Sequence, residues 1–226
     1  MNLTTKQLKQ IIQEELTSLI KEKTAAFHGW KMKPTQMRVS PQCDKPPDDN
    51  QWEAEEEGCP QFTNDKGVGA EHEDVLEAIN FINNVKPKTL IAYSRGGAMA
   101  VAAFNKGVQH KPTINFVAPA WKRGWVSQPS PSISVQGAII HGTKDAAVPL
   151  RQSFELSAAS GLPLYVFPER KHINILKFKS KPEAGTLVSP EVLQQGLKSL
   201  PDWGTGKSKP EQVQQQHDTF MRLLGK

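Results

Sequence analysis

Short apolar runs alternate with amphipathic stretches through the middle of the chain. From Glu71, the segment EHEDVLEAINFINNV repeats apolar residues at helical spacing, which predicts a helix that ends before Pro87. The predicted strands that follow are TLIAYS, TINFVAP, GAIIHG and LPLYVFP, and the helices among them begin near Arg95 and at Leu150. Buried parallel strands have continuous apolar runs, so this alternation predicts an α/β fold with a mostly parallel sheet and helices on both faces.

The two flanks of this region have different patterns. Residues 4–23 place six Leu and Ile side chains at helical spacing and predict an amphipathic helix. Residues 24–66 contain five prolines and the acidic run EAEEEG, which predict a mostly irregular segment. Two weakly helical segments follow His172. We therefore expect an N-terminal helix in 1–23, an irregular segment in 24–66, and an α/β domain with a C-terminal helical extension in 67–226.

Composition narrows the class of protein. The 226 residues are 37% hydrophobic and 23% charged, which is typical of a globular domain with polar arms. No stretch approaches the roughly 20 apolar residues of a membrane span, and charges interrupt any signal-peptide core at the start. We expect no membrane partner and a cytoplasmic location. The net charge of +5 is scattered, so we expect no nucleic-acid partner. Cys43 and Cys59 cannot form a metal site alone, and a reducing compartment favours free thiols over a bridge.

Ser94 stands between an apolar strand and a small-residue helix. A strand that turns sharply into a helix can hold a nucleophile in a strained, exposed position. The turn needs small residues two before and two after the nucleophile, because the strand and helix backbones nearly touch there. Ala92 and Gly96 meet this demand. The alternative is a buried serine that caps the helix.

Three sequence motifs, in the same order along the chain, resemble those of a known superfamily. The sequence AYSRGG resembles the nucleophile elbow of the α/β-hydrolases, and HGTKDAAVP, residues 141–149, resembles the acid-bearing loop of their esterase-like members. LPLYVFP leads to His172, where that superfamily carries its histidine. The resemblance covers about residues 71–175. It implies an α/β-hydrolase-like fold, a small-molecule ester or acyl substrate, and neither a cofactor nor a metal.

Elimination supports the same assignment of the catalytic residues. The superfamily order is serine, acid, histidine. The aspartates that follow Ser94 are Asp145, Asp202 and Asp218. Only Asp145 directly follows an apolar strand. Of the two later histidines, His217 lies in a polar C-terminal helix with no strand before it. We therefore predict that His172 removes the Ser94 proton and that Asp145 orients the imidazole.

Two backbone N–H groups should stabilise the oxyanion of an acyl-transfer reaction. One belongs to Arg95, the residue after the nucleophile. The second normally follows an earlier strand at a His-Gly pair, which favours Gly29 in FHGW. The preceding residues KEKTAA do not predict a strand, so the loop after a candidate strand at Met37–Ser40 remains an alternative.

The sequence gives fewer indications of the residues that contact the substrate than of the catalytic residues. Trp121 and Trp125 follow the strand TINFV, where they could line an acyl or leaving-group pocket or simply pack a surface loop on the core. No large insertion precedes the strand GAIIHG, so we expect little or no lid, which favours small or exposed esters. His141, at the end of that strand, is expected to be structural.

The N-terminal arm has a resemblance of its own. KQLKQIIQEEL resembles leader segments of virion proteins from large tailed phages, and IIQE resembles the sites that their prohead proteases cut. An ordinary surface or dimerising helix is the alternative. We expect a serine hydrolase of carboxylesterase type, with a peptidase as its variant. The competing class is a hydrolase-like binding or phage virion structural protein with little catalysis, whose N-terminal helix would contact a virion partner or a second copy.

Overall fold

The computed structural model describes residues 24–27, 60, 62, 72–121, 135–204, 206 and 208–226. Several sequence predictions lie outside these residues: the N-terminal helix, Gly29, the candidate strand Met37–Ser40, both cysteines and Trp125. Among the helices described, none has the length and apolar character needed to cross a membrane.

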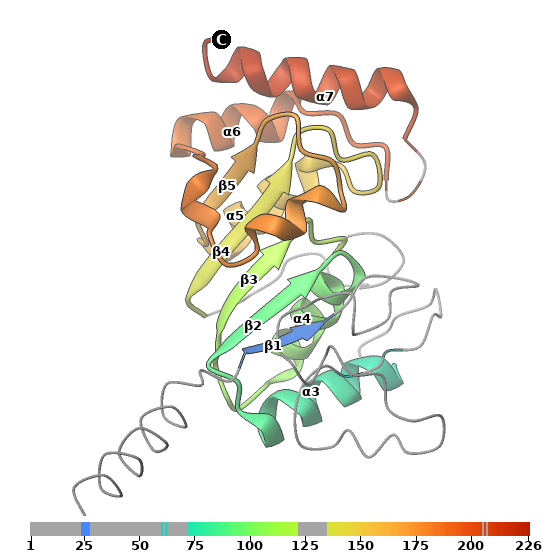
Figure 1. Ribbon diagram of the computed structural model, residues 1–226, viewed down its shortest axis with the longest axis vertical. Helices are drawn as coiled ribbons and strands as arrows, with labels where there is room; N and C mark the ends of the chain where they lie inside the picture. Colours follow the sequence, from blue (N-terminus) through green and yellow to red (C-terminus); the bar gives the residue numbers. More distant parts are fainter. Residues whose placement is uncertain are drawn as a thin grey trace, which may run out of the picture.

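A single six-stranded sheet forms the centre of the described chain (Figure 1). Its strands are β1 (Thr24–Phe27), β2 (Thr89–Tyr93), β3 (Thr113–Val117), β4 (Gly137–Gly142), β5 (Leu164–Phe167) and β6 (Thr186–Leu187). They lie in sequence order, and the first five are parallel. The short β6 pairs antiparallel with β5 at the edge. The predicted mostly parallel α/β sheet is confirmed, and all four predicted strands are present.

Strand β1 corrects the prediction for the segment 24–66. We expected an irregular chain from residue 24, whereas Thr24–Phe27 pairs in parallel with Thr89–Ala92. The strand escapes prediction because it is four residues long and half alanine, so it lacks the β-branched run that marks the others. Ala25 and Ala26 are buried on opposite faces of the sheet.

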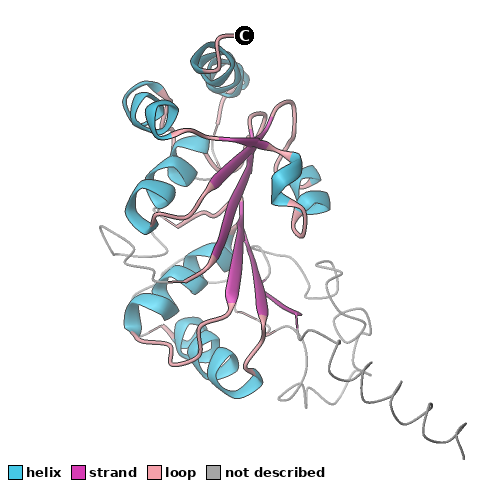
Figure 2. Cartoon of the chain, turned by 90° about the vertical axis from the view of Figure 1, so that its left-hand side faces the viewer, coloured by secondary structure: helices cyan, strands magenta, loops and turns pink. Residues whose placement is uncertain are grey.

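The long helices lie on one face of the sheet and a smaller helical segment lies on the other (Figure 2). They are α3 (Glu73–Val85), α4 (Arg95–Lys106), α5 (Leu150–Ser160), α6 (Pro190–Ser199) and α7 (Pro210–Leu223). The main core gathers between α3, α4, α5 and the sheet. On the other face, Ile175 of the 3₁₀ helix η2 (Asn174–Phe178) packs with Ile91 and Ile140. A second 3₁₀ helix, η3 (Pro182–Ala184), leads into β6.

The C-terminal helices belong to the main core. Phe220 of α7 is fully buried and meets Phe154 of α5 edge to face, with ring centroids 6.4 Å apart. Leu200, which ends α6, is buried in the same cluster. The segment predicted as a C-terminal extension is therefore packed against α5, next to the loop that carries Asp145.

Candidate active site

Ser94 occupies a strained position at the junction of β2 and α4. Its φ of +52° and ψ of −116° are rare for a residue with a side chain. Its backbone N–H donates to the Val117 carbonyl (3.0 Å), which holds the turn against β3. The Ser94 hydroxyl makes no capping hydrogen bond to α4, so the alternative of a helix-capping serine is wrong.

Two glycines allow the tight turn after Ser94. A Cβ at Gly96 would lie 2.6 Å from the carbonyl carbon of Phe27, the last residue of β1. A Cβ at Gly97 would lie 2.7 Å from the Pro119 Cβ. Both distances are far below ordinary contact. The small residue expected at position 96 is thus required by β1, a strand that the sequence did not predict.

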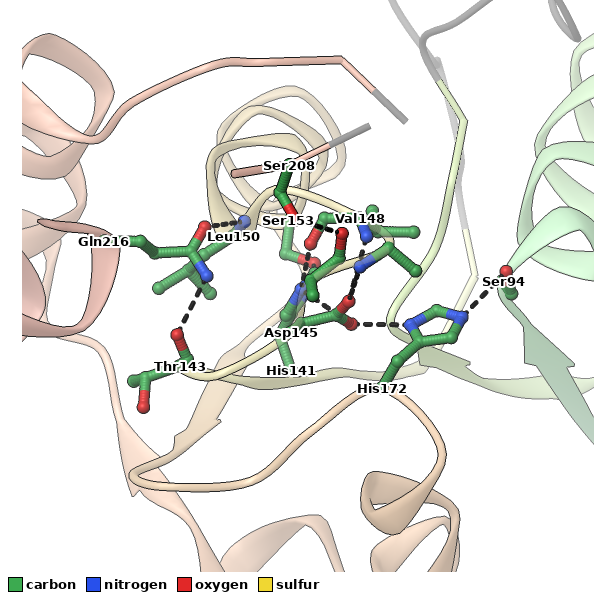
Figure 3. Close-up of polar contacts among 12 residues, drawn as sticks. Ser94, His141, Thr143, Asp145, Val148, Leu150, Ser153, His172, Ser208 and Gln216 are labelled. Carbon is green, nitrogen blue, oxygen red and sulfur yellow. Dashed lines mark hydrogen bonds and ion pairs between the residues drawn. The ribbon is translucent and has the colours of Figure 1, made fainter. Parts of the chain in front are cut away.

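The structure brings Ser94, His172 and Asp145 into one hydrogen-bonded chain (Figure 3). The Ser94 Oγ lies 3.1 Å from the His172 Nε2, and the His172 Nδ1 lies 2.6 Å from the Asp145 Oδ2. The three residues follow β2, β5 and β4, whose carboxyl ends meet at one edge of the parallel sheet. Ser94 is 8% exposed, so it is nearly buried rather than in the exposed position expected from the sequence.

Asp145 is fully buried and is held in its ionised form. Its Oδ1 accepts hydrogen bonds from the backbone N–H groups of Ala147 (2.8 Å) and Val148 (2.9 Å). Burial by itself would raise the pKa of this carboxyl, but the neighbouring His172 and His141 outweigh it and bring the pKa below its ordinary value. An ionised carboxylate here can orient the imidazole and stabilise its cationic form.

His141 is a second histidine on the same carboxylate. Its Nε2 lies 3.3 Å from the Asp145 Oδ2 and 3.1 Å from the Val148 carbonyl oxygen. Both neighbours are acceptors, so this nitrogen carries the proton. The other ring nitrogen lies 2.6 Å from the Ser153 hydroxyl of α5. His141 fixes the carboxylate from the side away from His172, in agreement with the structural role expected for it.

Tyr93 contacts both the ring and the backbone carbonyl of His172. The two rings are tilted by 34° with centroids 4.9 Å apart, and the Tyr93 hydroxyl donates to the His172 backbone carbonyl (3.3 Å). Burial, and after it the negative charge of Asp145, raise the pKa of Tyr93, so the phenol remains a donor. The residue directly before the nucleophile therefore positions the histidine. No pattern in the sequence indicated this role.

Gln216 of α7 holds both ends of the loop that carries Asp145 (Figure 3). Its side-chain carbonyl accepts from the Leu150 N–H (2.6 Å), and its amide donates to the Thr143 carbonyl (2.9 Å). Nearby, the Ser208 hydroxyl donates to the Ala146 carbonyl (2.6 Å). Gln216 is 66 residues from Leu150 in the chain, so no local sequence pattern indicates this contact.

Two further residues lie apart from Ser94: His217, which the sequence disfavours as the catalytic histidine, and Trp121, a candidate for the substrate pocket. His217 bonds to the Thr143 Oγ1 (2.8 Å) and to the Glu169 Oε1 (2.8 Å), so it lies apart from Ser94. Trp121 is 3% exposed and donates its indole N–H to the Gln152 carbonyl (2.7 Å), which places it in the core rather than in a pocket.

Arg95 begins α4, and the N–H groups of a first helical turn point out of the helix end, beside Ser94. Its guanidinium forms a buried ion pair with Asp74 of α3, which ties the first turn of α4 to that helix.

Within the described residues, no group of three or more His, Cys, Asp or Glu side chains is arranged to hold a metal ion.

Comparison with known proteins bears on the fold of the chain. No family model matches the sequence, and a search of curated proteins finds no match. A solved hydrolase of the alpha/beta superfamily from Xanthomonas campestris pv. campestris superposes with a TM-score of 0.51 at 16% identity, covering 76% of this chain and 96% of that one. A YdeN-like hydrolase from Pectobacterium atrosepticum gives 0.50 at 16% identity, covering 77% and 98%. The chain therefore has the fold of the α/β-hydrolases.

Proposed function

We propose that this protein is a serine hydrolase of carboxylesterase type, with Ser94 as nucleophile, His172 as general base and Asp145 as the supporting acid. The observation that carries the proposal is the continuous hydrogen-bonded chain from the Ser94 Oγ through His172 to a buried carboxylate. A serine hydroxyl is a weak nucleophile unless a base lies within hydrogen-bond reach, and here the base is itself oriented by a third group. The strained backbone at Ser94 and the hydrolase fold support the same conclusion.

The first half of the reaction forms an acyl-enzyme. The Ser94 Oγ attacks the acyl carbon while its proton passes to the His172 Nε2. Collapse of the tetrahedral intermediate breaks the bond to the leaving oxygen, which takes that proton from His172. Asp145 stabilises the transient imidazolium through the 2.6 Å contact with Nδ1. In the second half, water attacks the acyl carbon, gives its proton to His172, and displaces Ser94, which recovers the proton.

The negative oxygen of the tetrahedral intermediate needs preorganised donors. We assign one to the backbone N–H of Arg95, the first residue of α4 beside Ser94. Phe27 ends β1 against Gly96, so the chain leaves the sheet next to the nucleophile. This supports a second donor in the residues directly after β1, where Gly29 remains our candidate.

We favour an ester substrate over an amide because an alkoxide or phenoxide leaves more readily than an amine and needs less proton-transfer assistance from His172. The competing hypothesis, a hydrolase-like binding or virion protein, requires that the aligned serine is not reactive.

Hydrolysis of short p-nitrophenyl esters tests the proposal. We expect turnover by the native protein, with an initial burst of p-nitrophenol, and loss of turnover in Ser94→Ala. Ser199→Ala, which removes an exposed hydroxyl on α6, is the matched control and should behave as the native protein. A native burst that survives Ser94→Ala unchanged would overturn the assignment, and a folded protein without any turnover would favour the binding class.

A further inference from the structure

A cleft of about 750 Å³ opens beside His172, next to the loop that carries Asp145. Its walls come from that loop, from the segment around His172 and from the beginning of α7. Among the described residues that line it are Tyr93, Lys144, Lys171, His172, Ile173 and Val213. His172 and the tyrosine that contacts it, Tyr93, therefore both lie on the wall of the cleft.

The cleft lies beside the residue that protonates the leaving group in the proposed reaction. His172 delivers its proton to the leaving oxygen, so the departing group has to contact the imidazole. His172 lines the cleft, whereas Ser94 is not among its lining residues. The acyl group, which stays bonded to Ser94, therefore has its place outside this cleft.

Every charged residue that the structure places on the wall, His172 aside, is a lysine. These are Lys144 and Lys171, and no carboxylate is among the described lining residues. The Lys144 ammonium donates to the neutral Gln214 amide oxygen (2.6 Å), and its ion-pair partner among the described residues, the largely exposed Glu169 carboxylate, is 4.0 Å away. Its positive charge is therefore only weakly compensated.

The surroundings add to this positive potential. Helix α7 begins at Pro210, which lines the cleft, so the positive end of its dipole lies there. The acidic side chains of α7, Glu211 and Asp218, line an adjacent hollow together with Arg222, and this hollow shares Pro210 and Gln214 with the cleft. Apolar surface completes the cleft: Val213 lies on its wall, and the Ile173 side chain is 60% exposed.

On the basis of the hydrolase function proposed above, we propose that this cleft binds a leaving group that has an apolar body and carries an anionic substituent, a carboxylate or a phosphate. The apolar wall covers the body of the group, and Lys144 and Lys171 select its charge. The preferred substrates are then esters of anionic alcohols or phenols rather than neutral ones.

The test compares leaving groups that share one acyl group. The probes are 4-acetoxybenzoate, 4-acetoxyphenyl phosphate and the neutral 4-acetoxybenzamide. The measured quantity is the ratio of kcat/KM for each anionic ester to that for the amide-bearing ester, so differences in chemical reactivity cancel between variants. We expect Lys171→Gln and Lys144→Gln each to lower this ratio roughly two- to fivefold, the range of partly exposed ion pairs. Whichever anionic ester shows the larger drop identifies the preferred anion.

A matched control and a binding measurement keep the outcomes separate. Lys111→Gln removes an exposed lysine just before β3. It lies at the amino-terminal ends of the parallel strands, opposite the candidate site at their carboxyl ends, and should leave the ratio unchanged. NMR titration with 4-hydroxybenzoate and 4-hydroxybenzamide needs no turnover, and we expect tighter binding of the carboxylate that weakens in Lys171→Gln. Turnover of the esters with a ratio unaffected by both cleft variants, or equal binding of the two phenols, would overturn the cleft proposal alone. Absence of turnover with selective carboxylate binding would support the cleft and count against the hydrolase function.

Discussion

Gln216 offers a sharp test of how the C-terminal helix supports the candidate active site. Its side chain satisfies two buried backbone groups, the Leu150 N–H and the Thr143 carbonyl, at the two ends of the Asp145 loop. Gln216→Met keeps the volume and removes both hydrogen bonds. Leu150 begins α5, so its N–H has no partner within that helix. Each unsatisfied buried group costs about 1–3 kcal/mol, which gives about 2–6 kcal/mol for the pair.

The matched control is Gln215→Met, an exposed position on the same helix. For a domain of this size about 1 kcal/mol corresponds to roughly 2–4 °C in Tm, so Gln216→Met should melt at least about 4 °C below the control. Release of the loop should also lower kcat on p-nitrophenyl acetate by about tenfold or more, because small misplacements of a catalytic group are costly. Thermal melts and initial rates measure both effects. Equal Tm and equal kcat in the two variants would refute the view that α7 holds the loop.

Three further predictions concern the acid, the base and the N-terminal arm. His172→Ala should lose at least as much kcat as Asp145→Asn, and each should fall by about a thousandfold or more; native activity in His172→Ala would remove that residue from the mechanism. The folded pKa of Asp145 lies below its ordinary value of 3.8, so its stabilising effect is complete above that value and is lost as pH falls through the folded pKa. The Tm gap between native protein and Asp145→Asn should therefore be full at pH 7 and shrink below about pH 4, and a gap that widens in acid would contradict this sign. If residues 1–23 form a leader or partner helix, a chain beginning at Thr24 should keep its Tm within a few degrees and lose only self-association or particle binding; loss of buried Leu and Ile side chains, at roughly 1.5–3 kcal/mol each, would instead give a large drop.

The parts of the fold that follow from local pattern were predictable. The strands β2 to β5 are buried on both faces, so each has a continuous apolar run, and the order of Ser94, Asp145 and His172 at successive strand ends led to the three residues that the structure brings together. Strand β1 was missed because it is short and its two central residues, Ala25 and Ala26, are buried on opposite faces of the sheet although alanine has a low strand propensity.

The supporting contacts were not predictable, because they join residues far apart in the chain. Gln216 reaches Thr143 across 73 positions, and the Tyr93 hydroxyl reaches His172 across 79. Glutamine in a polar helix and tyrosine in an apolar strand are ordinary residues at those positions. The parallel sheet brings Tyr93 and His172 to the same edge, and the packing of α7 against α5 brings Gln216 to the Asp145 loop.

Reaction with a fluorophosphonate, followed by peptide mass spectrometry, tests the central claim that Ser94 is an activated nucleophile. We predict a single covalent adduct on the peptide that contains Ser94, no adduct in Ser94→Ala, and much slower labelling in His172→Ala, because the probe reacts with a serine only when a base assists it. A folded native protein that remains unlabelled while a reference serine hydrolase reacts, or an adduct that persists in Ser94→Ala, would contradict that claim.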